Sequence, residues 1–124
     1  MEKELAILKA LSDSNRMKIL DLLLHNDYCV GALALKLDLS EPAVSQHLKV
    51  LRQAGIVTGV KRGYYTHYDV NPEPLRQVAS ILVHMAVDEH NRKPCKLNET
   101  GDQKKCSLYV NKQKNKREQN ITQT

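Results

Sequence analysis

Apolar residues recur at helical spacing along the first half of the chain and predict four helices. Residues 2–11 form the first, with leucines three positions apart. The cluster Ser12-Asp13-Ser14-Asn15 then supplies side chains that end one helix and begin another, which runs to about His25. The predicted buried face of this second helix consists of Ile19, Leu20, Leu23 and Leu24.

A tight connection separates the third predicted helix, residues 30–37, from the fourth, which runs to about Ala54. Ser40 in this connection is a good N-cap, and Pro42 lies in the first helical turn, where its missing N–H is tolerated. Gly55 is a typical residue just after a helix end. Leu33 and Leu37 of the third helix are expected to pack against the apolar face of the fourth, which consists of Val44, Leu48 and Leu51.

The period changes after Gly55, where two runs rich in β-branched and aromatic residues predict a hairpin over 56–60 and 64–70. Lys61-Arg62-Gly63 is the predicted turn, and a last helix is expected from about Leu75 to Asn91. The fold class is therefore mainly α with a small β-hairpin (α+β), in the order α-α-α-α-β-β-α. A short helix, a tight turn and a second helix followed by a hairpin are typical of a winged helix-turn-helix.

Polar side chains cover the face of the fourth helix opposite its apolar face. Such side chains suit base edges and phosphates, although most polar helix faces are simply solvated. The position in the second helix of a tight pair favours a DNA-binding face, because that helix normally enters the major groove. With its cap and flanking positions, this face comprises Ser40, Pro42, Ala43, Ser45, Gln46, His47, Lys49 and Arg52.

Lys61 and Arg62 at the predicted hairpin tip form a basic wing that could reach phosphates or the minor groove. The alternative is an edge hairpin kept soluble by its charges. A winged helix that binds protein and not DNA would lack both the basic wing and the polar face.

The net charge of +5 is distributed unevenly along the chain. The segment from Arg92 onward holds nine basic and three acidic residues, which leaves a net charge of −1 on the preceding body. We therefore expect two parts: residues 1–92 as a DNA-binding and dimerisation domain, and residues 93–124 as a basic, cysteine-containing, flexible tail. The tail would add non-specific attraction to phosphates.

The composition and motifs exclude several functional classes. No apolar run approaches the roughly 20 residues of a membrane span, and the charged start lacks a signal-peptide pattern, so we expect a cytoplasmic protein and no membrane partner. No nucleophile–base set, phosphate loop or Cys-x-x-Cys motif is present, which argues against an enzyme. Three cysteines in a reducing compartment argue against a disulfide framework.

The sequence resembles the arsenic-repressor (ArsR/SmtB) family of transcriptional regulators over about residues 5–90. The stretch from Leu8 to Leu20 is similar to the family's opening pattern, and Val44-Ser45-Gln46-His47-Leu48 through Ala54-Gly55-Ile56-Val57 is similar to its helix-turn-helix signature. Arg62-Gly63-Tyr64-Tyr65 resembles its wing. The resemblance implies that Ser45, Gln46 and His47 approach DNA and that the protein represses a nearby operon until an inducer binds.

The last predicted helix is apolar over more than half its circumference, more than one small domain can cover. We therefore expect a homodimer, and the family forms such dimers from its first and last helices. A two-fold dimer would bind double-stranded DNA at a palindromic operator with half-sites about 10 bp, or a multiple, apart. The predicted interface comprises Leu5, Leu8, Val78, Ile81, Leu82 and Met85.

The inducer is left open between three alternatives. The arsenic-type Cys-x-Cys is incomplete, since Gly31 occupies the position of the second cysteine after Cys29. The zinc-type site is not carried over either, because Asp88-Glu89-His90 comes at the end of the last predicted helix and no suitable second pair of ligands follows at the required spacing. Cys95 and Cys106, with His90 or Cys29 as a third ligand, could bind a soft metal or metalloid ion, the one cofactor that the sequence suggests. Alternatively, Cys95 and Cys106 form a reversible disulfide, or the cysteines are inert.

Overall fold

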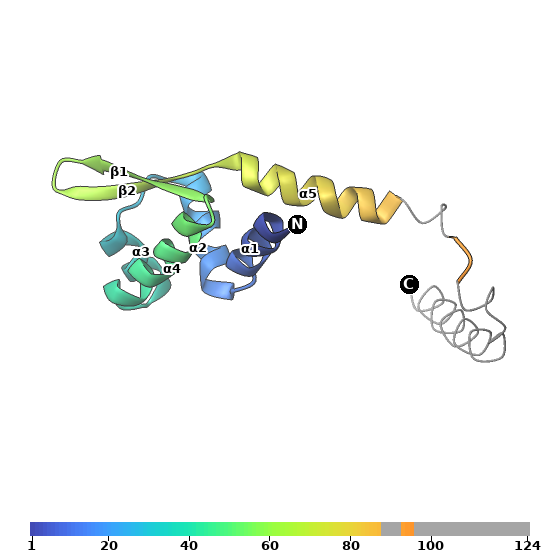
Figure 1. The fold of residues 1–124 in the computed structure, drawn as a ribbon. Helices are drawn as coiled ribbons and strands as arrows, with labels where there is room; N and C mark the ends of the chain where they lie inside the picture. The colour runs from blue at the N-terminus through green and yellow to red at the C-terminus, as the bar shows by residue number, and fades with distance from the viewer. Residues whose placement is uncertain (88–92, 96–124) are drawn as a thin grey trace. The chain divides into compact units, whose positions relative to one another are not determined.

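The computed structural model describes residues 1–87 and 93–95. The chain divides into two units, Met1–Val87 and Asp88–Thr124, and the fold described below is that of the first. Its elements follow in the predicted order α-α-α-α-β-β-α (Figure 1). They are α1 (Glu2–Leu11), α2 (Ser14–His25), α3 (Val30–Leu37), α4 (Glu41–Gln53), β1 (Val57–Arg62), β2 (Tyr65–Val70) and α5 (Pro72–Val87).

Local capping fixes the helix ends close to where the sequence predicts them. The Asp13 carboxylate accepts a hydrogen bond from the Arg16 backbone N–H at 3.0 Å and begins α2. Ser40 Oγ accepts from the Ala43 backbone N–H at 3.2 Å and begins α4. Between α3 and α4, Asp38 adopts a left-handed conformation with φ 53°, which a short polar side chain tolerates.

A Schellman motif ends α4. Gly55 has φ 76°, and its N–H donates to the Arg52 carbonyl at 2.9 Å. The Ile56 N–H donates to the Leu51 carbonyl, also at 2.9 Å, and the Ile56 side chain is fully buried. The glycine predicted to end this helix is therefore confirmed, and the motif aims the chain directly into β1.

The two strands pair antiparallel, with Arg62 opposite Tyr65 and Lys61 opposite Thr66. The predicted turn at Lys61-Arg62-Gly63 is therefore wrong, because both basic residues belong to β1 and the turn is Gly63-Tyr64. Gly63 has φ 65°, which suits the first central position of a type II′ turn. The Tyr64 side chain is 98% exposed at the tip.

The last helix begins at Pro72, three residues before the prediction. Proline is favoured at the first helical position, and Asn71 Oδ1 accepts from the Glu73 N–H at 3.3 Å as a cap. Asn71 also donates through its backbone N–H to the Ile56 carbonyl at 2.8 Å and through Nδ2 to the Gly55 carbonyl at 3.3 Å. This residue thus joins the end of α4, the start of β1 and the start of α5.

One hydrophobic core lies among the helices and the base of the hairpin. Apolar side chains of α2, α3 and α4 meet there, and the predicted packing of Val44, Leu48 and Leu51 near Leu33 is confirmed by their complete or nearly complete burial. One prediction of a buried residue is wrong, because Leu24 is exposed on α2. On α1, Ile7 and Ala10 are buried and Leu5 is exposed.

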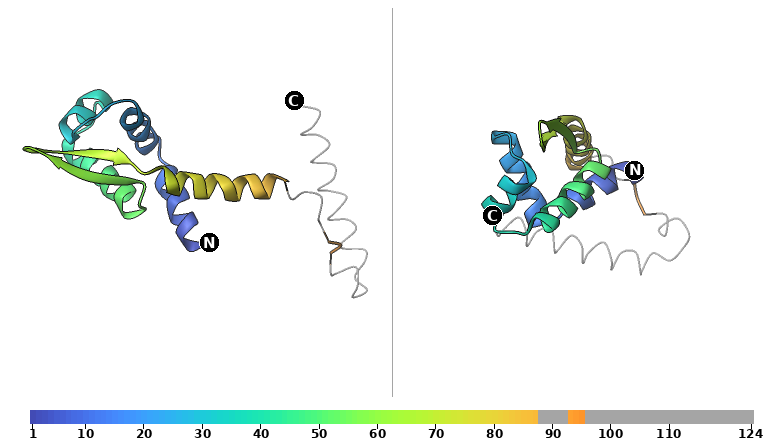
Figure 2. Two further views of the ribbon diagram at one scale, coloured as in Figure 1. Left: turned by 90° about the horizontal axis from the view of Figure 1, so that it is seen from above. Right: turned by 90° about the vertical axis from the view of Figure 1, so that its left-hand side faces the viewer.

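The hairpin and α5 extend from this helical body in opposite directions (Figures 1 and 2). The hairpin packs against α2 through β2 and against α4 through β1, while α5 leads away past α1. Within the described residues, no helix is long and apolar enough to cross a membrane.

Candidate nucleic-acid interface

The exposed face of α4 carries most of the side chains that the sequence predicts for DNA contact. The buried residues Val44, Leu48 and Leu51 fix the rotation of this helix, so the opposite face points to solvent. Ser40 is also exposed, although its hydroxyl already accepts the capping hydrogen bond. The exposed set on the helix comprises Pro42, Ser45, Gln46, Lys49 and Arg52.

His47 and Ala43 differ from this set because both are half-buried. The His47 side chain, 20% exposed, points to the junction of α1 and α2, where Nδ1 lies 3.4 Å from Arg16 Nη1 and 3.8 Å from Asp13 Oδ2. Arg16 Nε in turn donates to the carbonyl of Ala10, the penultimate residue of α1, at 2.6 Å. His47 therefore packs α4 against this junction, and Gln46 is the better placed of the two for base contact.

The junction also perturbs one carboxyl group. The backbone N–H of Arg16 donates to Asp13 and lowers the pKa of that carboxyl below its ordinary value, and the nearby charges of Arg16 and His47 act in the same direction. Asp13 therefore stays ionised where it caps α2. The sequence places Asp13 in the cluster that begins the second helix, but it does not predict the contact of Asp13 with His47 of α4.

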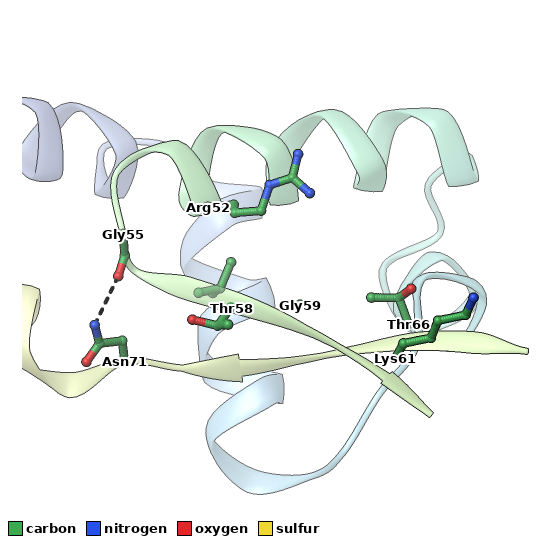
Figure 3. A pocket seen from close by; sticks show the side chains of 8 residues that line it. Arg52, Gly55, Thr58, Gly59, Lys61, Thr66 and Asn71 are labelled. Atoms are coloured by element: carbon green, nitrogen blue, oxygen red, sulfur yellow. Dashed lines mark hydrogen bonds between the residues drawn. The ribbon is translucent and has the colours of Figure 1, made fainter. Parts of the chain in front are cut away.

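Lys61 and Arg62 point to opposite faces of the wing, as successive strand residues must. Lys61 lines a hollow of about 590 Å³ between the end of α4 and the wing (Figure 3). The hollow brings the positive charges of Lys61 and Arg52 and the hydroxyl groups of two threonines to one concave surface. Its lining residues are Arg52, Gly55, Val57, Thr58, Gly59, Lys61, Thr66 and Asn71.

Arg62, on the other face, is already paired with a carboxylate. Its Nη1 donates to Asp27 Oδ2 in the connection between α2 and α3, and His67 Nδ1 lies 3.0 Å from Asp27 Oδ1. The predicted pair of wing cations is thus divided: Lys61 shares the hollow with Arg52, and Arg62 contacts the body of the domain.

The predicted dimer residues differ in how far the subunit itself covers them. Val78 is buried in the subunit core, and Leu8 and Ile81 are half-buried. Leu5 on α1 is exposed, as are Leu82 and Met85 on α5. Two further residues of α5, Val83 and Val87, are also exposed. The end of α5 and the start of α1 therefore carry large apolar side chains that the core of one subunit leaves uncovered.

The predicted thiol ligands are only partly within the described residues. Cys29 is half-buried at the N-cap of α3, and its backbone forms an isolated antiparallel bridge with His67. Cys95 is exposed, while His90 and Cys106 lie outside the described residues. Among residues 1–87 and 93–95, no three histidine, cysteine or acidic side chains gather closely enough to hold a metal ion.

Sequence reasoning missed Asp27, Thr58, Thr66 and Asn71. Once the strand register is known, Thr66 can be placed on the same face of the wing as Lys61, because the two residues are paired across the strands. Asp27 had no local signal, since it lies 35 residues from Arg62 and 40 from His67.

A helix-turn-helix with an exposed polar second helix and a cation-bearing hairpin beside it defines a winged helix-turn-helix of the DNA-binding class. A family model described as "Bacterial regulatory protein, arsR family" matches residues 13–58. The transcriptional repressor SdpR of Bacillus subtilis (strain 168) is 37% identical over 70 residues, which cover 56% of this chain and 78% of that protein. The chain belongs to the arsR family of bacterial regulatory proteins.

Two further similarities support this assignment. An arsenical resistance operon repressor of Staphylococcus aureus is 37% identical over 101 residues, covering 81% of this chain and 96% of that protein. The solved structure of an ArsR-like transcriptional regulator from Rhodococcus sp. RHA1 superposes with a TM-score of 0.64 at 30% identity, covering 70% of this chain and 82% of that chain. The predicted family and fold are thus confirmed, and the chain is a transcriptional regulator with a DNA-binding helix-turn-helix.

Proposed function

We propose that the chain is a homodimeric repressor that binds a palindromic operator through α4 and the Lys61 face of the wing. The observation that carries the proposal is the continuity of the exposed polar face of α4 with the hollow beside the wing. Gln46 suits an adenine edge in the major groove, where amide side chains bond bidentately. Arg52 and Lys61 at the hollow suit the phosphates that flank such a contact.

The uncovered apolar side chains of α1 and α5 support the homodimer. Leu5, Leu82 and Met85 would be buried against a second copy, and a two-fold axis would present two α4 helices to the same side of the DNA. Two recognition helices about 34–36 Å apart fit successive major grooves, which is why the proposed operator is a palindrome.

The proposed inducer acts at cysteine thiols and is a soft metal or metalloid ion. The support is the donor chemistry of Cys95 and Cys106 in the sequence, together with the similarity to an arsenical resistance operon repressor. The described residues do not by themselves provide a metal site, so a complete site would need residues outside them. A reversible disulfide between Cys95 and Cys106 is the second candidate, because nearby lysines activate thiols.

The test is fluorescence anisotropy of the full chain with its own upstream DNA and with unrelated DNA at fixed salt. Gln46→Ala is expected to lower affinity for the upstream DNA by about 10-fold or more and to leave affinity for unrelated DNA unchanged. Lys61→Ala should weaken both, whereas Lys3→Ala, at an exposed lysine in the first turn of α1, serves as the control. Equal affinity of the unmodified protein for both DNAs would refute the proposal.

The same assay decides between the two inducers. Release of DNA by arsenite or a soft divalent ion in the reduced protein, lost in Cys95→Ser or Cys106→Ser, supports the ion. Release on oxidation, reversed by a reductant, supports the disulfide instead. Tight binding under every condition would refute both and indicate inert cysteines.

A further inference from the structure

One carboxylate connects the wing to the helical body near its tip. Asp27, between α2 and α3, binds Arg62 from β1 through one oxygen and lies 3.0 Å from His67 of β2 through the other. Both strands of the hairpin therefore contact the same side chain. The connection is local to the outer half of the wing, since Arg62 is the last residue of β1.

The backbone next to Asp27 reinforces this connection. Cys29 forms an antiparallel bridge with His67, so the segment after Asp27 runs alongside β2. A two-stranded hairpin alone is marginally stable in water and needs a third element to hold it. The Asp27–Cys29 segment supplies such an element beside β2, in addition to the contacts of the hairpin with α2 and α4.

The charges of the wing follow from the same geometry. Lys61 faces the hollow shared with Arg52, whereas Arg62 on the opposite face is compensated by Asp27. A cation that neutralises a DNA phosphate releases counterions and steepens the dependence of affinity on salt. A cation already paired with a carboxylate must give up that partner before it can do the same.

We propose that Asp27 withholds Arg62 from the phosphate contacts of the wing: its carboxylate pairs with Arg62 and lies beside His67, which leaves Lys61 as the wing cation that binds DNA. The proposal rests on the proposed function, in which α4 and the wing bind DNA. It assigns to the connection between α2 and α3 a role in how strongly and how selectively the wing binds.

The experiment measures the salt dependence of binding to upstream DNA by fluorescence anisotropy of the full chain. Arg62→Ala is expected to have the slope of the unmodified protein. Asp27→Asn is expected to be steeper by about 0.9 for each released Arg62, or about 1.8 for a dimer. Adding Arg62→Ala to Asp27→Asn should restore the original slope.

Asp69→Asn is the matched control, because Asp69 is an exposed carboxylate on the same hairpin and, by the strand register, on the same face as Arg62. It should leave the slope unchanged. A shallower slope for Arg62→Ala alone would overturn the proposal, because Arg62 would then contact phosphate with Asp27 present. An unchanged slope for Asp27→Asn, in a variant that unfolds at the normal temperature, would also overturn it.

Failure of the underlying function gives a different result. If the unmodified protein bound its upstream DNA no more tightly than unrelated DNA, the proposed function would fail before any variant was compared. If Asp27→Asn did not fold, a shallower slope for Arg62→Ala alone would still overturn the proposal.

Discussion

The proposed dimer can be tested at Leu82, in the uncovered part of α5. Full burial of a leucine side chain contributes about 2 kcal/mol. Leu82 keeps 49% of its surface exposed in the subunit, so covering the remainder would contribute about 1 kcal/mol. A two-fold interface contains each residue twice, and Leu82→Ala should therefore weaken dimerisation by about 2 kcal/mol, or about 30-fold in the dimer Kd.

Sedimentation equilibrium over a range of protein concentrations measures that Kd directly. Leu35→Ala is the control, because Leu35 is 87% exposed on α3 and lies outside the proposed interface. If exposed area alone governed association, Leu35→Ala would have the larger effect. An unchanged Kd for Leu82→Ala, or an equal loss in both variants, would refute the interface drawn from α1 and α5.

Three predictions concern the stability of the domain. Gly63→Ala should lower the free energy of unfolding by about 1 kcal/mol in urea denaturation, because Gly63 has φ 65°, a backbone conformation that is unfavourable for alanine. No atom lies close to the added Cβ, so the backbone conformation alone accounts for the loss. A loss near zero would contradict the turn described at Gly63-Tyr64. Leu48→Ala should cost about 3 kcal/mol in the same assay, since Leu48 is almost completely buried, and a cost under about 1 kcal/mol would contradict the core described here. Asp13→Asn should keep near-normal stability at neutral pH, because asparagine also caps helices. The lowered pKa of Asp13 means that its carboxylate stabilises the fold above its ordinary value of 3.8 and that this contribution is lost as the pH falls through the lowered pKa. Acid titration of unfolding should therefore be shallower in Asp13→Asn, and identical titrations would disprove this account.

The helices could be predicted closely from the sequence because their ends depend on neighbouring residues. Asp13, Ser40 and Gly55 act within a few positions of the helix that each one begins or ends. The register of the hairpin was harder to predict. Lys61 and Arg62 are polar and suit a turn, and only their pairing with residues of β2 places them inside a strand.

The candidate site could be predicted in part for the same reason. The exposed face of α4 follows from helical periodicity, and Gln46 is where the sequence places it. His47 lies at the edge of that face, and its burial depends on Arg16 and Asp13 in an earlier helix. The role of Asp27 depends on contacts across 35 and 40 residues, which no local pattern contains.

Asn71 couples any movement of α5 to the end of α4. Its three hydrogen bonds join the first turn of α5 to the carbonyls of Gly55 and Ile56, at the end of the DNA-facing helix. A rotation of α5 must either carry the end of α4 with it or break these bonds. In the proposed dimer, a change in the angle between the two α5 helices would therefore be passed through Asn71 to the ends of both α4 helices.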